Sequence, residues 1–135
     1  MPAAQSGILL EHCRSGLFLE AAILNLNNIK QSCTQFLNEL ETLQQRYPDA
    51  KLGAVIAFGD SIWKQLGNSD SATELKPFIT LGKGNLSAPA TQRDLLIHIQ
   101  SLRVDVTFSA GQMAMRVFGD SIAVEEETHG FRWIE

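Results

Sequence analysis

The sequence has few cysteines. It contains only Cys13 and Cys33, and they are not arranged as CxxC. Small disulfide-stabilised folds need several cysteines at regular spacings, and this chain lacks them. The pattern favours two reduced, partly buried thiols in a cytosolic protein over a disulfide or a reactive thiol.

Long apolar runs and clusters of positive charge are also absent. No run reaches the roughly 18 apolar residues that suggest a membrane span, and the opening MPAAQSGILLEHC lacks the basic region and apolar core of a signal peptide. The 11 Lys and Arg residues are scattered among 15 Asp and Glu residues, for a net charge of -4. This balance argues against nucleic acid as the main partner. We therefore expect a cytoplasmic protein without a membrane or nucleic-acid partner.

The length of 135 residues predicts a single domain, residues 1–135. A chain of this size buries about two thirds of the surface that its unfolded state exposes, which is enough for a core. Its first residues, Met1 to Gly7, are small and polar and are expected to be mobile, and Ile8 to Leu10 form a short apolar patch that can dock on the body.

The clearest strand lies within Pro89 to Arg103. Its residues alternate between two faces, as in a strand with one apolar face and one mixed face. The apolar face carries Leu95, Ile97 and Ile99, and the mixed face carries Leu96, His98 and Gln100. We expect the apolar face to pack on helices and the mixed face to meet a second domain or another subunit.

The other elements follow from apolar periodicity and from turn residues. In the first half we expect a strand from Arg14 to Leu24, a helix from Ile29 to Arg46, a strand from Leu52 to Phe58 and a short helix to Leu66 anchored by Trp63. An irregular loop is expected from Lys76 to Ala90. In the second half we expect a helix from Asp105 to Phe118 capped by Gly119, a strand from Ile122 that Gly130 breaks, and a last strand from Phe131 to Ile134.

This order predicts the α+β, ferredoxin-like (split βαβ) fold. Such a fold has a four-stranded antiparallel sheet with two main helices on one face. The other face is then left uncovered, and a second copy or a second domain is the usual cover for an apolar face of that size.

The histidines are candidates for chemistry. His12, His98 and His129 show no HxH or HExxH spacing, so no metal site is expected. His98, in the middle of its strand, is interpreted as a structural residue in preference to a ligand, a general base or an interface contact. His129 is also interpreted as structural, and His12 is expected to lie in an exposed N-terminal segment.

Two further patterns are weaker. Gly82-Lys83-Gly84 lacks the phosphate-binding pattern GxxxxGK[ST] and does not join a strand directly to a helix. On a strand, Glu125 and Glu127 face one side and Glu126 the other, which predicts a solvated edge that discourages sheet pairing rather than a cation site. No serine or cysteine lies in a nucleophile elbow. The residues by themselves therefore predict no catalytic, cofactor-binding or metal-binding residue.

Four blocks of sequence resemble the dye-decolorizing (DyP-type) haem peroxidases, in particular their bacterial branch with intracellular members. The blocks are QSGILLEHC at Gln5 to Cys13, LGAVIAFG at Leu52 to Gly59, PATQRDLLIHIQSLR at Pro89 to Arg103 and EETHGFRW at Glu126 to Trp133. They occur in the family's order and span essentially the whole chain. The resemblance implies the N-terminal half of such an enzyme, which builds two ferredoxin-like domains into a dimeric α+β barrel architecture.

The resemblance also implies what this half lacks. In the family, haem is held mainly by the second domain, the distal aspartate belongs to a GxxDG motif after the HGFRW block, and the distal arginine and the proximal histidine lie further on. This chain contains no GxxDG and ends at Glu135. We therefore expect the C-terminal haem-binding domain to be absent, haem not to be bound stably, and the isolated chain to be inactive. The parent reaction would be hydrogen-peroxide-dependent oxidation of dyes, phenols or porphyrin-like reductants.

Two alternatives remain open. One is a non-catalytic ferredoxin-like module for dimerisation or binding, which forms a homo-oligomer through the open sheet face. The other is a small stand-alone enzyme with a pocket between helices and sheet, for which His98 is the only obvious polar group.

Overall fold

The computed structural model describes residues 3–68 and 70–133. Its main sheet contains the strands β1 (Ser15–Ile23), β2 (Gly53–Phe58), β5 (Leu95–Ser101) and β6 (Ile122–Phe131). The longer helices are α1 (Leu26–Arg46) and α3 (Val104–Phe118), with the one-turn helix α2 (Asp60–Trp63). The others are the 3-10 helices η1 (Pro48–Ala50) and η3 (Gly119–Ser121) and the π-helix η2 (Lys64–Asn68), and the remaining strands are β3 (Leu81–Lys83) and β4 (Leu86–Ala88).

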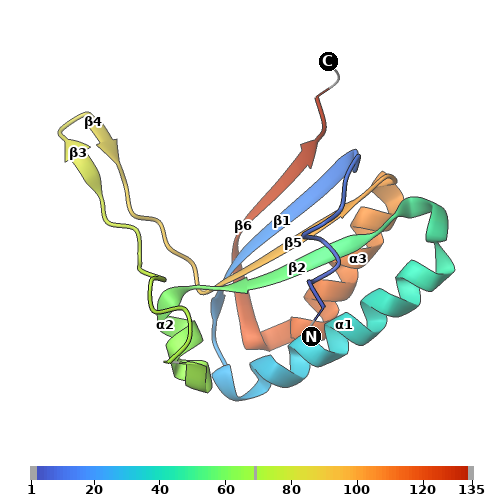
Figure 1. Cartoon of the computed structure of the whole chain (residues 1–135), viewed down its shortest axis with the longest axis horizontal. Helices are drawn as coiled ribbons and strands as arrows, with labels where there is room; N and C mark the ends of the chain where they lie inside the picture. The colour runs from blue at the N-terminus through green and yellow to red at the C-terminus, as the bar shows by residue number, and fades with distance from the viewer. Residues whose placement is uncertain (1–2, 69, 134–135) are drawn as a thin grey trace.

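The main sheet is antiparallel in the order β2-β5-β1-β6, and β3 and β4 form a separate two-stranded sheet. The helices α1 and α3 cover one face of the main sheet (Figure 1). This order, with both helices on one side, confirms the ferredoxin-like prediction. In the part of the chain described, no helix has the length and apolar character to cross a membrane.

The core lies between this sheet and the two helices. Leu95, Ile97 and Ile99 of β5 are at most 1% exposed. From the helices, Phe36 and Phe118 meet over them, with ring centroids 6.0 Å apart. The prediction of which β5 residues face the helices is confirmed, because period-two alternation on a central strand assigns each side chain to one face.

The close approach of α3 to the sheet depends on Gly111. A Cβ atom at this buried position would lie 2.4 Å from Leu17 Cδ2 of β1. The missing side chain therefore lets the backbone of α3 pack directly on a core leucine.

Helix α1 begins earlier than predicted. The side chain of Asn25 accepts a hydrogen bond from the backbone N–H of Asn27 (3.2 Å), so the helix starts at Leu26 rather than at Ile29. Gly119, with φ 45°, ends α3 as predicted. The short helix α2 is anchored by Ile62, which is 7% exposed, whereas the predicted anchor Trp63 is only half-buried.

Two loop and strand predictions were wrong. Gly130 does not break β6, because it pairs with Gly16 in a ladder that continues to Phe131. Arg132 and Trp133 are not in a strand, and Ile134 lies outside the described residues. The stretch predicted as an irregular loop contains the hairpin β3–β4. In both cases backbone pairing outweighs the local preference of glycine and proline.

Within the segment predicted to be mobile, residues 5–7 are hydrogen-bonded to the sheet, and Met1 and Pro2 lie outside the described residues. The Gln5 side chain accepts a hydrogen bond from the N–H of Ile56 (2.8 Å) and donates one to its carbonyl (3.0 Å). The Ser6 hydroxyl accepts a hydrogen bond from the N–H of Ala54, and the N–H of Gly7 donates one to the carbonyl of Ala54. These bonds satisfy backbone groups of the edge strand β2 that no strand pairs with. This is why a polar segment becomes ordered.

Asp94 joins three strands just before β5. Its carboxylate accepts from the N–H of Ile23 in β1 (2.9 Å), and its own N–H donates to the carbonyl of Ala21 (3.2 Å). Its carbonyl accepts from the N–H of Gly59, which follows β2 (3.0 Å). Asp94 thus fixes the end of the sheet from which residues 70–92 emerge.

Replacing Asp94 by alanine would leave the part-buried N–H of Ile23 without its acceptor. We expect the substitution Asp94→Ala to lower the free energy of unfolding by about 1–3 kcal/mol. Asp94→Asn keeps an acceptor oxygen and should lose less than half as much. Urea unfolding of the three proteins measures the difference, and equal stability of wild type and Asp94→Ala would contradict the assigned bond.

Candidate functional site

The candidate functional site is the sheet face opposite the helices, called here the open face. Residues paired directly across antiparallel strands share a face, so the strand register defines it. It contains Gly16, Phe18 and Glu20 of β1, Leu96, His98 and Gln100 of β5, Val55 and Ala57 of β2, and Glu126, Thr128 and Gly130 of β6. The predicted mixed face of β5 is thus confirmed to lie away from the helices.

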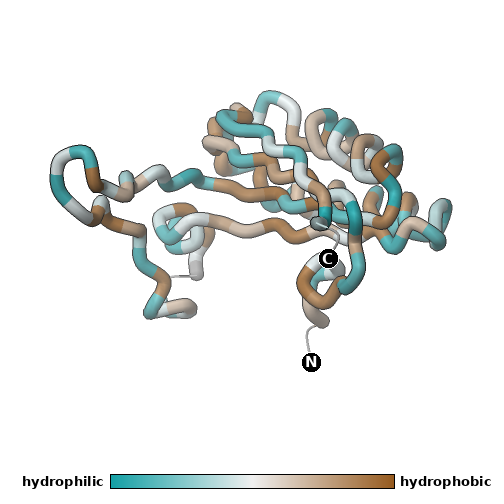
Figure 2. Tube along the Cα trace, turned by 90° about the horizontal axis from the view of Figure 1, so that it is seen from above, coloured by the Kyte–Doolittle hydropathy of each residue, from teal (hydrophilic) through white to brown (hydrophobic). Residues whose placement is uncertain are grey.

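Part of the open face is covered by the N-terminal segment. The Gln100 side chain donates a hydrogen bond to the carbonyl of Gly7 (2.6 Å). Figure 2 shows the sheet from above, with the helices on one side and the N-terminal segment on the other. The remaining apolar side chains, Phe18, Val55 and Leu96, are only half-buried. The open face is therefore a mixed surface with a half-buried apolar centre.

His98 lies at the centre of this face. Its ring stacks on Phe18, with centroids 4.2 Å apart and an angle of 10° between the planes. Burial lowers the pKa of His98 below its ordinary value. Desolvation disfavours the charged form of an imidazole, so the neutral ring is the form that fits this stack. The observed packing supports a structural or interface residue.

The other two histidines lie elsewhere. His129 pairs with Leu17, so it lies on the helix side of β6, where its Nε2 is 2.6 Å from Glu127 Oε1. His12 Nδ1 is 3.2 Å from Arg132 Nη1. The structure thus brings none of the three histidines together. Among the described residues, no group of three or more His, Cys, Asp or Glu side chains could hold a metal ion.

The two cysteines are free and half-buried. Burial raises the pKa of Cys33 to about 11, and it also raises the pKa of Cys13. Both thiols are therefore protonated at neutral pH, which fits the predicted unreactive thiols.

The glycine-rich pattern lies in the β3–β4 hairpin, and the acidic pattern lies on the edge strand β6. Gly84 lies in the turn between β3 and β4 with φ 54°, and no helix follows it to hold a phosphate. The three glutamates are exposed, as predicted for a solvated edge. Glu125 is the extra residue of a β-bulge opposite Glu20 and Ala21, and it forms an ion pair with Arg93 (2.9 Å). The bulge was missed because alternation alone does not reveal an inserted residue.

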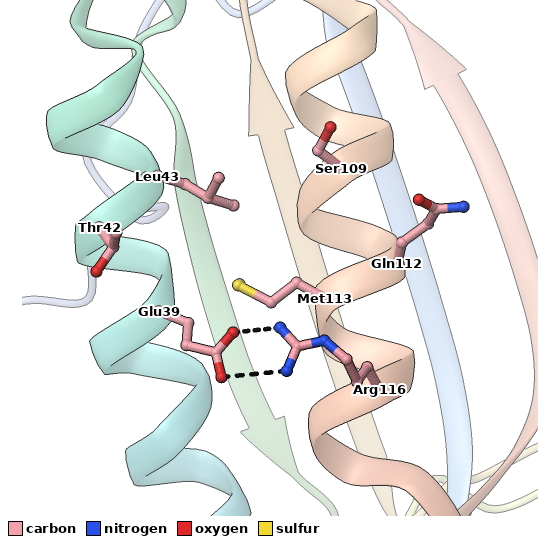
Figure 3. A pocket seen from close by; sticks show the side chains of 7 residues that line it. All are labelled: Glu39, Thr42, Leu43, Ser109, Gln112, Met113 and Arg116. Atoms are coloured by element: carbon pink, nitrogen blue, oxygen red, sulfur yellow. Dashed lines mark hydrogen bonds and ion pairs between the residues drawn. The ribbon is translucent and has the colours of Figure 1, made fainter.

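A groove between α1 and α3, on the outer side of the helices, has a volume of about 460 Å³. Figure 3 shows that the guanidinium of Arg116 reaches across it to the carboxylate of Glu39, which lowers the pKa of Glu39. His98 lies on the opposite side of the sheet from this groove. His98 is therefore not a residue of a pocket between helices and sheet, and a stand-alone enzyme of that kind would lack the polar group that the sequence suggested for it.

Together, the strand order and the open face define the class: a ferredoxin-like α+β domain with one sheet face covered by helices and the other available to another domain. Comparison with known proteins then gives the family. The family described as "Dyp-type peroxidase, N-terminal" matches residues 5–132. The chain belongs to this family, as the resemblance of the four blocks predicted.

Relatives and solved structures agree with this assignment. The chain is 37% identical over 90 residues to a dye-decolorizing peroxidase of Mycobacterium tuberculosis, covering 67% of this chain and 27% of that protein. It is 28% identical over 139 residues to one of Rhodococcus erythropolis, covering 100% of this chain and 40% of that protein.

Two solved structures match the fold closely. The encapsulated DyP-type peroxidase of Mycobacterium smegmatis matches with a TM-score of 0.89 and 27% identity over 99% of this chain and 44% of that chain. A DypB variant of Rhodococcus jostii in complex with heme matches with a TM-score of 0.80 and 27% identity over 98% of this chain and 44% of that chain. The chain thus spans less than half the length of these relatives.

The described residues do not by themselves fit a haem. An axial ligand must point a ring nitrogen into a cavity that can hold the porphyrin. His98 lines neither the groove between α1 and α3 nor the groove between α3 and β1. The open face also places Glu20 opposite Glu126, and two carboxylates would repel the propionates of a haem. No step of a haem reaction is therefore assigned to these residues.

The lowered pKa of His98 predicts a pH dependence of stability. Its folded pKa lies below 6.5, so between the two pKa values the unfolded chain binds more protons. The contribution of neutral His98 to the free energy of unfolding is complete above about pH 6.5, and it is lost as the pH falls toward the folded pKa of His98. His98→Phe keeps an aromatic ring and removes the titrating group. We expect urea unfolding to show a smaller loss of stability for His98→Phe than for wild type between about pH 7 and pH 5, and equal losses would contradict the assigned burial.

Proposed function

We propose that this chain forms the N-terminal half of a haem peroxidase that uses hydrogen peroxide to oxidise dyes, phenols or porphyrin-like reductants. The observation that carries the proposal is the family match over residues 5–132, together with relatives named as dye-decolorizing peroxidases. The related DypB variant in complex with heme supports haem as the cofactor. Haem supplies the chemistry that cleaves the O–O bond of peroxide.

In this proposal the chain is a scaffold and the haem-binding residues lie in the second half of the protein. The open face is the surface on which that half packs. Phe18, Val55 and Leu96 offer it an apolar surface, and neutral His98 can be buried there without leaving a charge unpaired. Glu20 and Glu126, which face each other, favour a cationic side chain on the covering half, because like charges directly opposite each other destabilise a sheet.

The isolated chain is then inactive, because it would supply neither the axial ligand nor the distal acid–base groups. This separates the proposal from a non-catalytic module that acts alone through its open face. Such a module would need no downstream half for its function.

The proposal is tested with haemin, hydrogen peroxide and a dye. We expect the 135-residue chain mixed with haemin to oxidise the dye no faster than free haemin and to show no saturable Soret shift. The same residues joined to a downstream half that contains GxxDG should show both.

The control is the joined protein with His98→Phe, which should keep its activity if His98 only packs. Saturable turnover by the isolated chain would contradict its proposed inactivity. No turnover by the joined protein would contradict the proposed peroxidase function.

A further inference from the structure

Two of the ten glycines, Gly16 and Gly130, differ from the others. The other eight either have a positive φ or lie where an added Cβ atom would come within 3.0 Å of another residue. At Gly16 and Gly130 the atom nearest to an added Cβ is Cε2 of Phe18, at 3.6 Å and 3.9 Å, which is ordinary van der Waals contact. The backbone and the packing of this domain would therefore accept alanine at both positions.

Glycine is unfavourable inside a strand. It loses more conformational entropy on folding than alanine does, and it has no side chain to pack. Where glycine occurs in a strand, it often marks a place that another segment approaches closely. Such a segment would explain glycine at two positions where this domain does not require it.

The two glycines lie side by side on the open face. Gly16 of β1 pairs with Gly130 of β6, and the next pair on the same face is Phe18 with Thr128. The glycine pair, as Gly16 and Gly130 are called here, thus lacks the layer of side chains that its neighbours have. The edge of the Phe18 ring borders it. A side chain placed on the glycine pair would contact this ring.

A third glycine on the open face is already covered in this way. Gly53 pairs with Gln100, which pairs with Gly16, so these positions and Gly130 form one row across the sheet. An added Cβ at Gly53 would lie 2.2 Å from Cδ1 of Leu10. The N-terminal segment therefore places a large apolar side chain directly on a glycine of this row.

The downstream half of the proposed peroxidase is the occupant that fits the glycine pair. The chain leaves β6 at Phe131, directly after Gly130, so a half that folds back onto the open face reaches this end of the sheet first. A layer that packs on a sheet lies about 10 Å from it, and protein interiors contain few voids. A pair without side chains must then meet a large side chain of the covering layer, and the bordering Phe18 ring favours an apolar one.

We propose that a large apolar side chain of the downstream half packs directly on Gly16 and Gly130, against the edge of the Phe18 ring. This contact rests on the proposed function, which supplies the downstream half. It assigns to the glycine pair the role that Gly53 has under Leu10, which is to leave room for a side chain from another segment.

The first test is thermal unfolding of the joined protein, in which a downstream half follows these residues. We expect Gly16→Ala and Gly130→Ala each to lower the unfolding midpoint by at least about 2 °C, because the added methyl overpacks the contact. The control is Thr128→Val, which changes an exposed side chain on the same face of β6 without adding volume and should leave the midpoint unchanged.

The sign of the shift decides between the two cases. Without a side chain on the glycine pair, alanine should leave the midpoint unchanged or raise it, because alanine restricts the unfolded chain and meets only ordinary contacts. An unchanged or raised midpoint for both alanine variants would overturn the proposal.

A photo-crosslinking amino acid at position 128 identifies the neighbour of the glycine pair even if the alanine variants fold poorly. We expect mass spectrometry of the joined protein to find position 128 linked to the downstream half, at or next to a large apolar residue. Cross-links only to residues 1–135, or none, would overturn the proposal.

Dye oxidation by the joined protein tests the proposed function separately. Turnover together with unchanged or raised midpoints would overturn the contact alone. Lowered midpoints and a cross-link to the downstream half, without turnover, would support the contact and contradict only the peroxidase function.

Discussion

The double pairing of β5 is the constraint on which the rest of the structure depends. β5 is hydrogen-bonded to β1 on one side and to β2 on the other, so it lies inside the sheet. Its side chains alternate between the helix-covered face and the open face. Ile97 and Ile99 form the floor of the helix-covered core, while His98 and Gln100 form the centre of the open face. A shift of one residue in this register would move polar groups into the core. The core and the candidate site are thus fixed by the same hydrogen bonds.

The two edge strands of the sheet are protected from further strand pairing in different ways. The β2 edge is occupied by the N-terminal segment, with the amide of Gln5 taking the place of a strand. The β6 edge carries the bulge at Glu125 and a row of acidic side chains, which are known means of discouraging unwanted strand pairing. Among the described residues, the open face leaves Phe18, Val55 and Leu96 half-buried, and residues 70–92 are exposed.

Much of the fold could be predicted from local pattern. The alternation around His98 and the apolar stripe of α1 predicted the buried faces, the order of elements along the chain predicted the fold, and four sequence blocks indicated the family. Three features could not be predicted in this way. Gly130 continues a strand, Gln5 binds an edge and residues 81–88 form a hairpin. Each depends on backbone partners far away in the sequence or on pairing that composition does not reveal.

The sequence by itself determined the ferredoxin-like class, the assignment of Leu95, Ile97 and Ile99 to the core, and membership of the peroxidase family. These follow from periodicity and from short motifs, which are local properties of the chain. Only the tertiary structure decided that His98 stacks on Phe18, that Glu125 lies in a bulge beside Arg93, and that residues 70–92 leave the sheet at the end of β1 opposite to Phe131. The reason is physical: these features arise from contacts between strands, and their partners become neighbours only when the sheet has formed.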